Sequence, residues 1–248
     1  MWASPQPVVA VTFQTDPNGS VPSSIAAVLT WNSTAQPTVT YSTTGHHAGD
    51  DYLLELQAPA SGVTATGAYS WSVTITATLT GGNVTRTISG TAFAVVNGPI
   101  TFDYYGWTLA SEGILVAVSK PAAGLLWVHG GGGVEYFPQL TSTTYQTPLN
   151  DPATLVKNTD GSYTYTNNHQ IKYNFDPTYG HLTSIVDPHG LAATYVYSGG
   201  QLTAIDGPDG GVTTFGYDGS GHLTGMTLAD GSQCAPSRND CHFGRLNQ

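Results

Sequence analysis

The sequence predicts an all-β protein, from two features of its composition and one repeat. Only 9% of the 248 residues are charged, against about a quarter in ordinary globular proteins, while the chain has 30 glycines and 14 tyrosines. Threonine and valine are also abundant, and these residue types favour strands over helices. The last third of the chain repeats every 20 or 21 residues with a glycine turn in each unit, which is typical of stacked β-hairpins.

Residues 1–97 are expected to form an immunoglobulin-like β-sandwich. Between Tyr69 and Ile75 the apolar residues occupy every second position, so one face of that strand is predicted to be buried and the other to carry Ser and Thr. The segment from Thr80 to Asn83 contains two glycines and is predicted to be a hairpin turn. The expected strands are 8–13, 25–31, 38–42, 52–57, 68–79 and 84–96.

A second domain is expected at residues 98–231, after a boundary at residues 97–99. Residues 100–150 combine short strands with irregular loops and include four consecutive glycines, 130–133. A phosphate-binding loop would need a Lys-Ser or Lys-Thr pair and a following helix, and neither is present, so this run is interpreted as a flexible turn. From residue 162 onward, one hairpin follows another.

The repeat itself comprises residues 173–194, 195–214 and 215–234. Its leucine recurs as Leu182, Leu202 and Leu223, and its turn glycine recurs with the same spacing as Gly190, Gly210 and Gly231. A single hairpin cannot bury its apolar face alone, so the three units are predicted to stack into one sheet.

These units resemble the tyrosine-aspartate (YD) repeats of rearrangement-hotspot (Rhs) proteins. The pairs Phe175-Asp176 and Tyr217-Asp218 are each followed by a Gly-x-Leu-Thr strand and a glycine-containing turn, while the middle unit has Tyr197-Ser198 in place of the pair. Residues 106–109, 133–137 and 160–164 are similar to the segment that precedes such repeats.

The resemblance implies a fold in which many repeats wrap into a hollow β-shell that encloses a toxin or decorates a cell surface. Three units cannot close such a shell, so the family's function transfers poorly. His181 and His222 stand where the family usually has arginine, and Gln201 stands there in the middle unit. Both histidines are expected at the surface.

The charge balance excludes several partners. The formal net charge is −10 with six basic residues, whereas nucleic acid and anionic membranes are bound by clustered Lys and Arg. No apolar run approaches the roughly 20 residues of a membrane span, and the N-terminus lacks a signal-peptide pattern. The parent protein is nevertheless expected to be extracellular or at the cell surface, from its low charge and Thr/Ser/Gly-rich composition.

Residues 232–248 form an atypical tail. They contain both cysteines of the chain, Cys234 and Cys241, which could form one disulfide, and the strand pattern stops at Gly231. We interpret the tail as a point where the natural reading frame is interrupted, as in a cloned fragment. A natural C-terminal extension is the alternative.

Sequence motifs assign no catalytic residue. The chain has no Gly-x-Ser-x-Gly elbow, no His-Glu-x-x-His helix and no Cys-x-x-Cys pair. One candidate metal site is the loop with His46, His47 and Asp50, beside Asp51. A solvated polar loop between two strands is the favoured interpretation of that segment.

The repeat geometry gives another candidate metal site, comprising His169, Asp187 and His189. If residues 170–176 pair antiparallel with residues 181–187, these three side chains lie at one end of the sheet. Two imidazoles and a carboxylate suit zinc or a similar divalent ion, which would lower the pKa of a bound water. Ordinary turn chemistry, with Asp accepting local backbone hydrogen bonds, is the favoured alternative.

The leading functional interpretation is a structural or adhesion segment of a larger secreted or surface protein, with no cofactor and no chemistry of its own. Its open last strand is expected to pair with another chain, in a homodimer for example, or to be covered by the tail. The alternatives are a metal-dependent hydrolase of small activated esters or phosphoesters, and a carbohydrate-binding module. The aromatic residues considered for sugar binding, for which core packing is favoured, are Tyr104, Tyr105, Trp107, Trp127, Tyr136 and Phe137.

Overall fold

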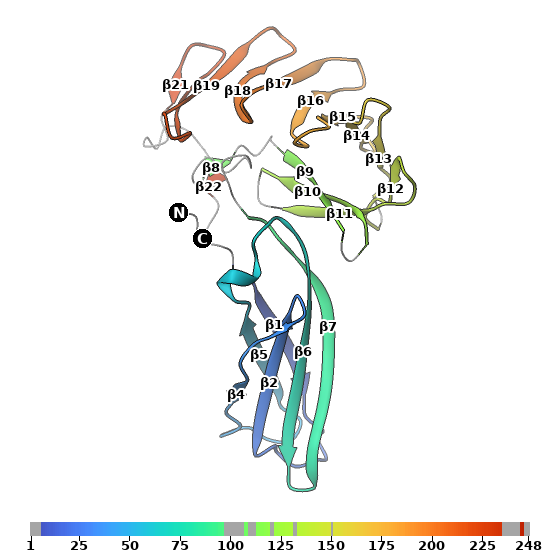
Figure 1. The fold of residues 1–248 in the computed structure, drawn as a ribbon, viewed down its shortest axis with the longest axis vertical. Coiled ribbons are helices and arrows are strands. Elements are labelled where there is room, and N and C mark those ends of the chain that lie inside the picture. The colour runs from blue at the N-terminus through green and yellow to red at the C-terminus, as the bar shows by residue number, and fades with distance from the viewer. Residues whose placement is uncertain are drawn as a thin grey trace. The chain divides into compact units, whose positions relative to one another are not determined.

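The described part of the chain is almost entirely β, which confirms the predicted class. A computed structural model describes residues 6–96, 107–108, 113–119, 122–130, 133–149, 151–234 and 244–245. Within these residues the only helical element is a 3₁₀ turn, η1 (Ala60–Gly62). None of the described helical structure has the length and apolarity needed to cross a membrane. The chain divides into two compact units, Met1–Val96 and Asn97–Gln248 (Figure 1).

The first unit consists of two antiparallel sheets that share one core. One sheet pairs β1 with β5, and the other has the order β3-β2-β6-β7, with β4 also paired to β2. The unit is therefore a two-sheet sandwich, and its immunoglobulin-like character stays a prediction. The strands are β1 (Val8–Gln14), β2 (Ser24–Trp31), β3 (Thr34–Ala35), β4 (Val39–Tyr41), β5 (Asp51–Gln57), β6 (Gly67–Leu79) and β7 (Gly82–Ala94).

Alternation of apolar and polar residues produces the core of this sandwich. Side chains of β2 and β5 are buried at every second position. On β6, Tyr69, Val73 and Ile75 are buried, as the period-two pattern predicts. Trp31 is fully buried, and its Nε1 donates to the carbonyl of Gly62 at 3.0 Å, so the apolar ring is buried without leaving its N–H unpaired.

The described residues of the second unit form three sheets. Strands β9 (Gly113–Val118), β10 (Gly124–His129) and β11 (Val134–Pro138) form one, and β8 (Trp107–Thr108) pairs with β22 (Gly244–Arg245). The third sheet is a ten-stranded antiparallel meander that follows a curved path (Figure 1). Its strands are β12 (Thr144–Tyr145), β13 (Thr154–Lys157), β14 (Tyr163–Thr166), β15 (Lys172–Phe175), β16 (Leu182–Val186), β17 (Ala192–Ser198), β18 (Gln201–Asp206), β19 (Val212–Tyr217), β20 (Leu223–Thr227) and β21 (Gln233–Cys234).

The predicted stacking of hairpins is confirmed in this meander, since each repeat adds two strands. The register shifts at the same place in each unit, namely just before Phe175, Tyr197 and Tyr217. The leucine is buried in all three units, as Leu182, Leu202 and Leu223, and Tyr195 and Phe215 are buried at the position that the half-buried Tyr173 occupies in the first unit. Burying one such leucine contributes roughly 2 kcal/mol.

The three-stranded sheet packs against the meander through Trp127 of β10. The Trp127 ring makes edge contacts with Tyr165, Tyr173 and Phe175, with ring centroids 5.0–5.4 Å apart. Trp127 and Phe137 are buried, which confirms core packing for these two aromatics. Tyr136 is half-buried and donates to the carbonyl of Ala122. Tyr104, Tyr105 and the Trp107 side chain lie outside the described residues.

Candidate functional site

The turns of the meander carry several of its Asp and His side chains, including Asp187, His189, Asp218 and His222. In these turns, apart from the Gly199-Gly200 turn between β17 and β18, an aspartate or asparagine accepts backbone N–H groups a few residues ahead, and a residue with positive φ closes the loop. At residue 170, Gln170 takes this role with a φ of 61° where the other turns use glycine. These carboxylates therefore stabilise their own turns.

Asp218 and His222 show this turn most fully. Asp218 Oδ1 accepts the N–H groups of Ser220 and His222, and its Oδ2 lies 2.7 Å from His222 Nδ1. The His222 side chain holds the pKa of Asp218 below its ordinary value, with further help from the backbone N–H groups. Asp230 has a lowered pKa for a related reason, because Ser232 donates its hydroxyl and N–H to the carboxylate.

Acid is expected to weaken these turns. The pKa of Asp218 and of Asp230 is lower in the folded protein than the ordinary 3.8. Their stabilisation is therefore complete above about pH 4 and is lost as pH falls through the lower folded values. Thermal unfolding between pH 7 and pH 2 should show a falling Tm below pH 4. Asp218→Asn should show a smaller fall, because asparagine forms the same turn at Asn167 without titrating. An equal fall in the variant would contradict this assignment.

Polar contacts also link each repeat to the next. Tyr197 Oη donates to the carbonyl of Leu182 at 3.1 Å, and Tyr217 Oη donates to the carbonyl of Leu202 at 2.7 Å, with the same spacing of 15 residues. Gln201 Nε2 donates to the carbonyl of Gly221. These contacts lock the stacking of neighbouring units.

The predicted surface position of His181 is wrong. His181 is only 4% exposed, and its ring stacks between those of Tyr179 and Tyr197, at centroid distances of 5.5 and 4.6 Å. Its backbone N–H donates to Asp176 Oδ2, and it forms a β-bridge with Ile114 of the three-stranded sheet. The side chain is buried because the flat imidazole fills the gap between a repeat and this second sheet.

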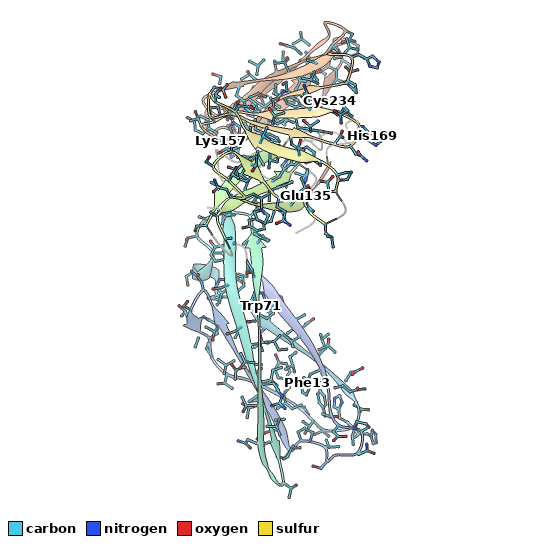
Figure 2. The ribbon with its side chains drawn as sticks, turned by 90° about the vertical axis from the view of Figure 1, so that its right-hand side faces the viewer. Phe13, Trp71, Glu135, Lys157, His169 and Cys234 are labelled. Atoms are coloured by element: carbon cyan, nitrogen blue, oxygen red, sulfur yellow. The ribbon has the colours of Figure 1, made fainter. Side chains whose placement is uncertain are left out.

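The structure places His169, Asp187 and His189 in two neighbouring turns at one rim of the meander, where Figure 2 labels His169. Asp187 and His189 come together, with Oδ2 and Nδ1 3.4 Å apart, but no hydrogen bond or ion pair joins either to His169 within the described residues. Asp187 Oδ1 instead accepts the N–H groups of His189 and Leu191. The His189 side chain is 85% exposed.

The loop with His46 and His47 places both rings near one carboxylate. The Nδ1 atoms lie 3.5 and 3.8 Å from Asp50 Oδ2, which also accepts the N–H of His47. The His46 ring stacks on Tyr52 at 4.2 Å. Across the described residues, neither this loop nor the repeat rim holds a group of three His, Cys, Asp or Glu side chains placed for a metal ion.

Sequence reasoning missed one half-buried polar cluster in the second unit. His129 of β10 packs on Trp127 at 4.3 Å, and its Nε2 lies 3.7 Å from Glu135 Oε1. Burial lowers the pKa of His129, although the nearby Glu135 carboxylate opposes this shift. Among the residues that the structure describes, Trp127 Nε1 and His129 Nε2 are buried without hydrogen-bond partners. The residues lie on adjacent strands, β10 and β11, and only the pairing of these strands brings them together, so the cluster could not be predicted from the sequence.

Comparison with known proteins identifies the repeats. Residues 176–212 and 198–233 match the family described as RHS Repeat. No curated protein matches the chain. Cys234, at the end of the matched region, is disulfide-bonded, and the other cysteine of the chain, Cys241, lies outside the described residues together with most of the tail.

Proposed function

Because residues 176–233 of this chain are RHS repeats, which are typical of extracellular and cell-surface proteins, we propose that it is a structural segment of a larger protein of that kind. Its role is to carry and space other parts of the parent protein. The proposed partners are other protein chains, including a second copy, that pair with the end of the repeat sheet. No cofactor is needed for this role.

One observation carries the proposal: the polar side chains of the repeats are engaged in building the sheet. Asp176, Asp187 and Asp218 accept hydrogen bonds from their own turns. Tyr197 and Tyr217 each donate to the preceding repeat. A catalytic site would instead leave an acid, a base or a nucleophile available to a substrate.

A combined metal and activity assay tests this proposal against hydrolysis. Purified protein should show no stoichiometric divalent metal by elemental mass spectrometry. It should also show no turnover of chromogenic phosphate, sulfate or carboxylate esters above a heat-denatured control. His169→Ala and His189→Ala should behave like the parent chain, because both side chains are exposed on structural turns.

The opposite result is equally clear. About one equivalent of zinc or a similar metal, with turnover that chelation abolishes and that either alanine variant loses, would replace the structural role with a hydrolase. Turnover that both variants retain would place the chemistry elsewhere in the chain and would also contradict the proposal.

A further inference from the structure

The sandwich of the first unit has an open groove at one end. The groove has a volume of about 990 Å³ and lies between the end of β1 and the β6–β7 hairpin. Phe13 of β1 lines it on one side, and Ile75 and Ala77 of β6 lie beneath it. Val84 and Ile88 of β7 form the other side. Figure 2 labels Phe13 and also Trp71, which lies farther along β6.

The groove exists because the two sheets are unequal. The β1–β5 sheet has two strands, whereas the facing sheet continues through β2 and β6 to β7. On β6 the core-facing Val73 and Ile75 are 0% and 5% exposed. On β7, Ile88 pairs with Val73 and is 41% exposed. Val84 pairs with Ala77 on the same face and is 43% exposed. The uncovered apolar strip is therefore confined to β7.

One additional strand beside β1 would cover the exposed apolar strip on β7. In the described residues β1 pairs only with β5, so the backbone N–H and C=O groups on its other side have no strand partner. Strands in a sheet lie about 4.8 Å apart and facing sheets about 10 Å apart. A strand added to this edge of β1 would lie over the inner face of β7. Strand addition of this kind is a common mode of peptide recognition.

Arg86 and Asp16 are the charged side chains that line the groove, and Arg86, which lies on β7 within the uncovered strip, selects among possible strands. Arg86 is the only Lys or Arg in residues 1–96, and it lies on β7 between Val84 and Ile88 on the same face. Its guanidinium donates to the carbonyl of Thr85 at 3.1 Å. No ion pair with a carboxylate is found for it within the described residues. A matching strand would present a carboxylate between two apolar side chains.

We propose that this groove binds an extended segment of a partner protein that adds to the free edge of β1. The segment carries an apolar residue, an Asp or Glu, and a second apolar residue at alternating positions. Its apolar side chains cover Val84 and Ile88, and its carboxylate pairs with Arg86. Partial burial strengthens such a charge pair and sets the register of the added strand.

The test uses the full chain and a nine-residue probe peptide with neutral ends, acetyl-Gln-Thr-Val-Thr-Asp-Thr-Val-Thr-Gln-amide. Binding is followed by NMR, with amide shifts expected along β1 and β7. Arg86→Glu should weaken binding by about tenfold or more, and a peptide with Lys in place of Asp should bind that variant better than the parent chain. The control Thr85→Glu alters the opposite face of β7 and should leave binding within about twofold.

Three results would overturn the proposal. One is no shift at peptide concentrations up to about 1 mM, a range that covers weak strand addition. Another is equal binding of the Asp and Lys peptides to the parent chain, which would remove the role of Arg86. The third is a concentration-dependent dimer in sedimentation that protects the same amides, which would make a second copy of this chain the occupant.

Discussion

Replacing Gly180 with alanine is expected to destabilise the second unit by roughly 3–5 kcal/mol, well above the ordinary effect of a substitution in a turn. Gly180 has a φ of +72°, which L-residues adopt only at a cost. A Cβ at this position would overlap the backbone carbonyl of Leu115 in β9. The backbone of Leu115 cannot move aside as a flexible side chain could. The same contact includes the hydrogen bond from Leu115 N–H to the carbonyl of Gly180 at 2.8 Å.

Gly190→Ala is the matched control for this prediction. Gly190 also closes a repeat turn and has a φ of +88°, but no atom lies within 4 Å of an added Cβ. Alanine at residue 190 should lower the free energy of unfolding only by the cost of the left-handed backbone conformation, about 1–2 kcal/mol. Urea unfolding followed by tryptophan fluorescence measures both, since Trp127 lies in the interface between the two sheets. Equal losses in the two variants would show that contact with Leu115 contributes nothing.

The sequence predicted the repeats well because their determinants are local. Alternation buries Leu182 and its equivalents, and the turn glycines at 190, 210 and 231 all have positive φ. Each of these features is decided within about ten residues of chain, where strand period and turn chemistry agree. The fold of residues 176–233 could therefore be read without knowing what surrounds them.

The features that could not be predicted from the sequence depend on contacts between residues far apart in the chain. His181 is buried by Tyr197 and by a bridge to Ile114, which lies 67 residues earlier. The metal site predicted at His169, Asp187 and His189 stays a prediction that rests on strand pairing alone. Their turns do lie side by side, as the pairing argument required, but Asp187 already accepts N–H groups of its own turn. The register of paired strands predicts which turns are neighbours, but it does not predict which hydrogen-bond partner each side chain chooses.

Deletion of one whole repeat, residues 195–214, is expected to leave a folded protein with one fewer hairpin. Joining Thr194 to Phe215 replaces Tyr195 by Phe215 and Tyr197 by Tyr217 at equivalent positions. Tyr217 would then donate to the carbonyl of Leu182, as Tyr197 does in the parent chain. Because repeat stability is nearly a sum of units and interfaces, the meander should lose stability but keep its architecture.

Deletion of half a repeat, residues 195–204, is expected to unfold the meander. It removes one strand's worth of chain, so every following strand would run opposite to its direction in the parent chain. The following turns would then lie at the other rim of the sheet, and the contacts between equivalent residues of neighbouring repeats would be lost. The buried leucines at 182 and 223 would no longer lie on equivalent strands.

Circular dichroism and urea unfolding distinguish the two deletions. The whole-repeat variant should retain a β spectrum and a cooperative transition, with a slope reduced because less surface is exposed on unfolding. The half-repeat variant should lose both. If the whole-repeat variant also unfolds, the meander needs the specific contacts of its central repeat. The repeats would then form a single fixed body whose number of units cannot change. A modular scaffold tolerates a change of length by whole units, whereas a fixed body does not, so this comparison decides how the repeats can serve a larger protein.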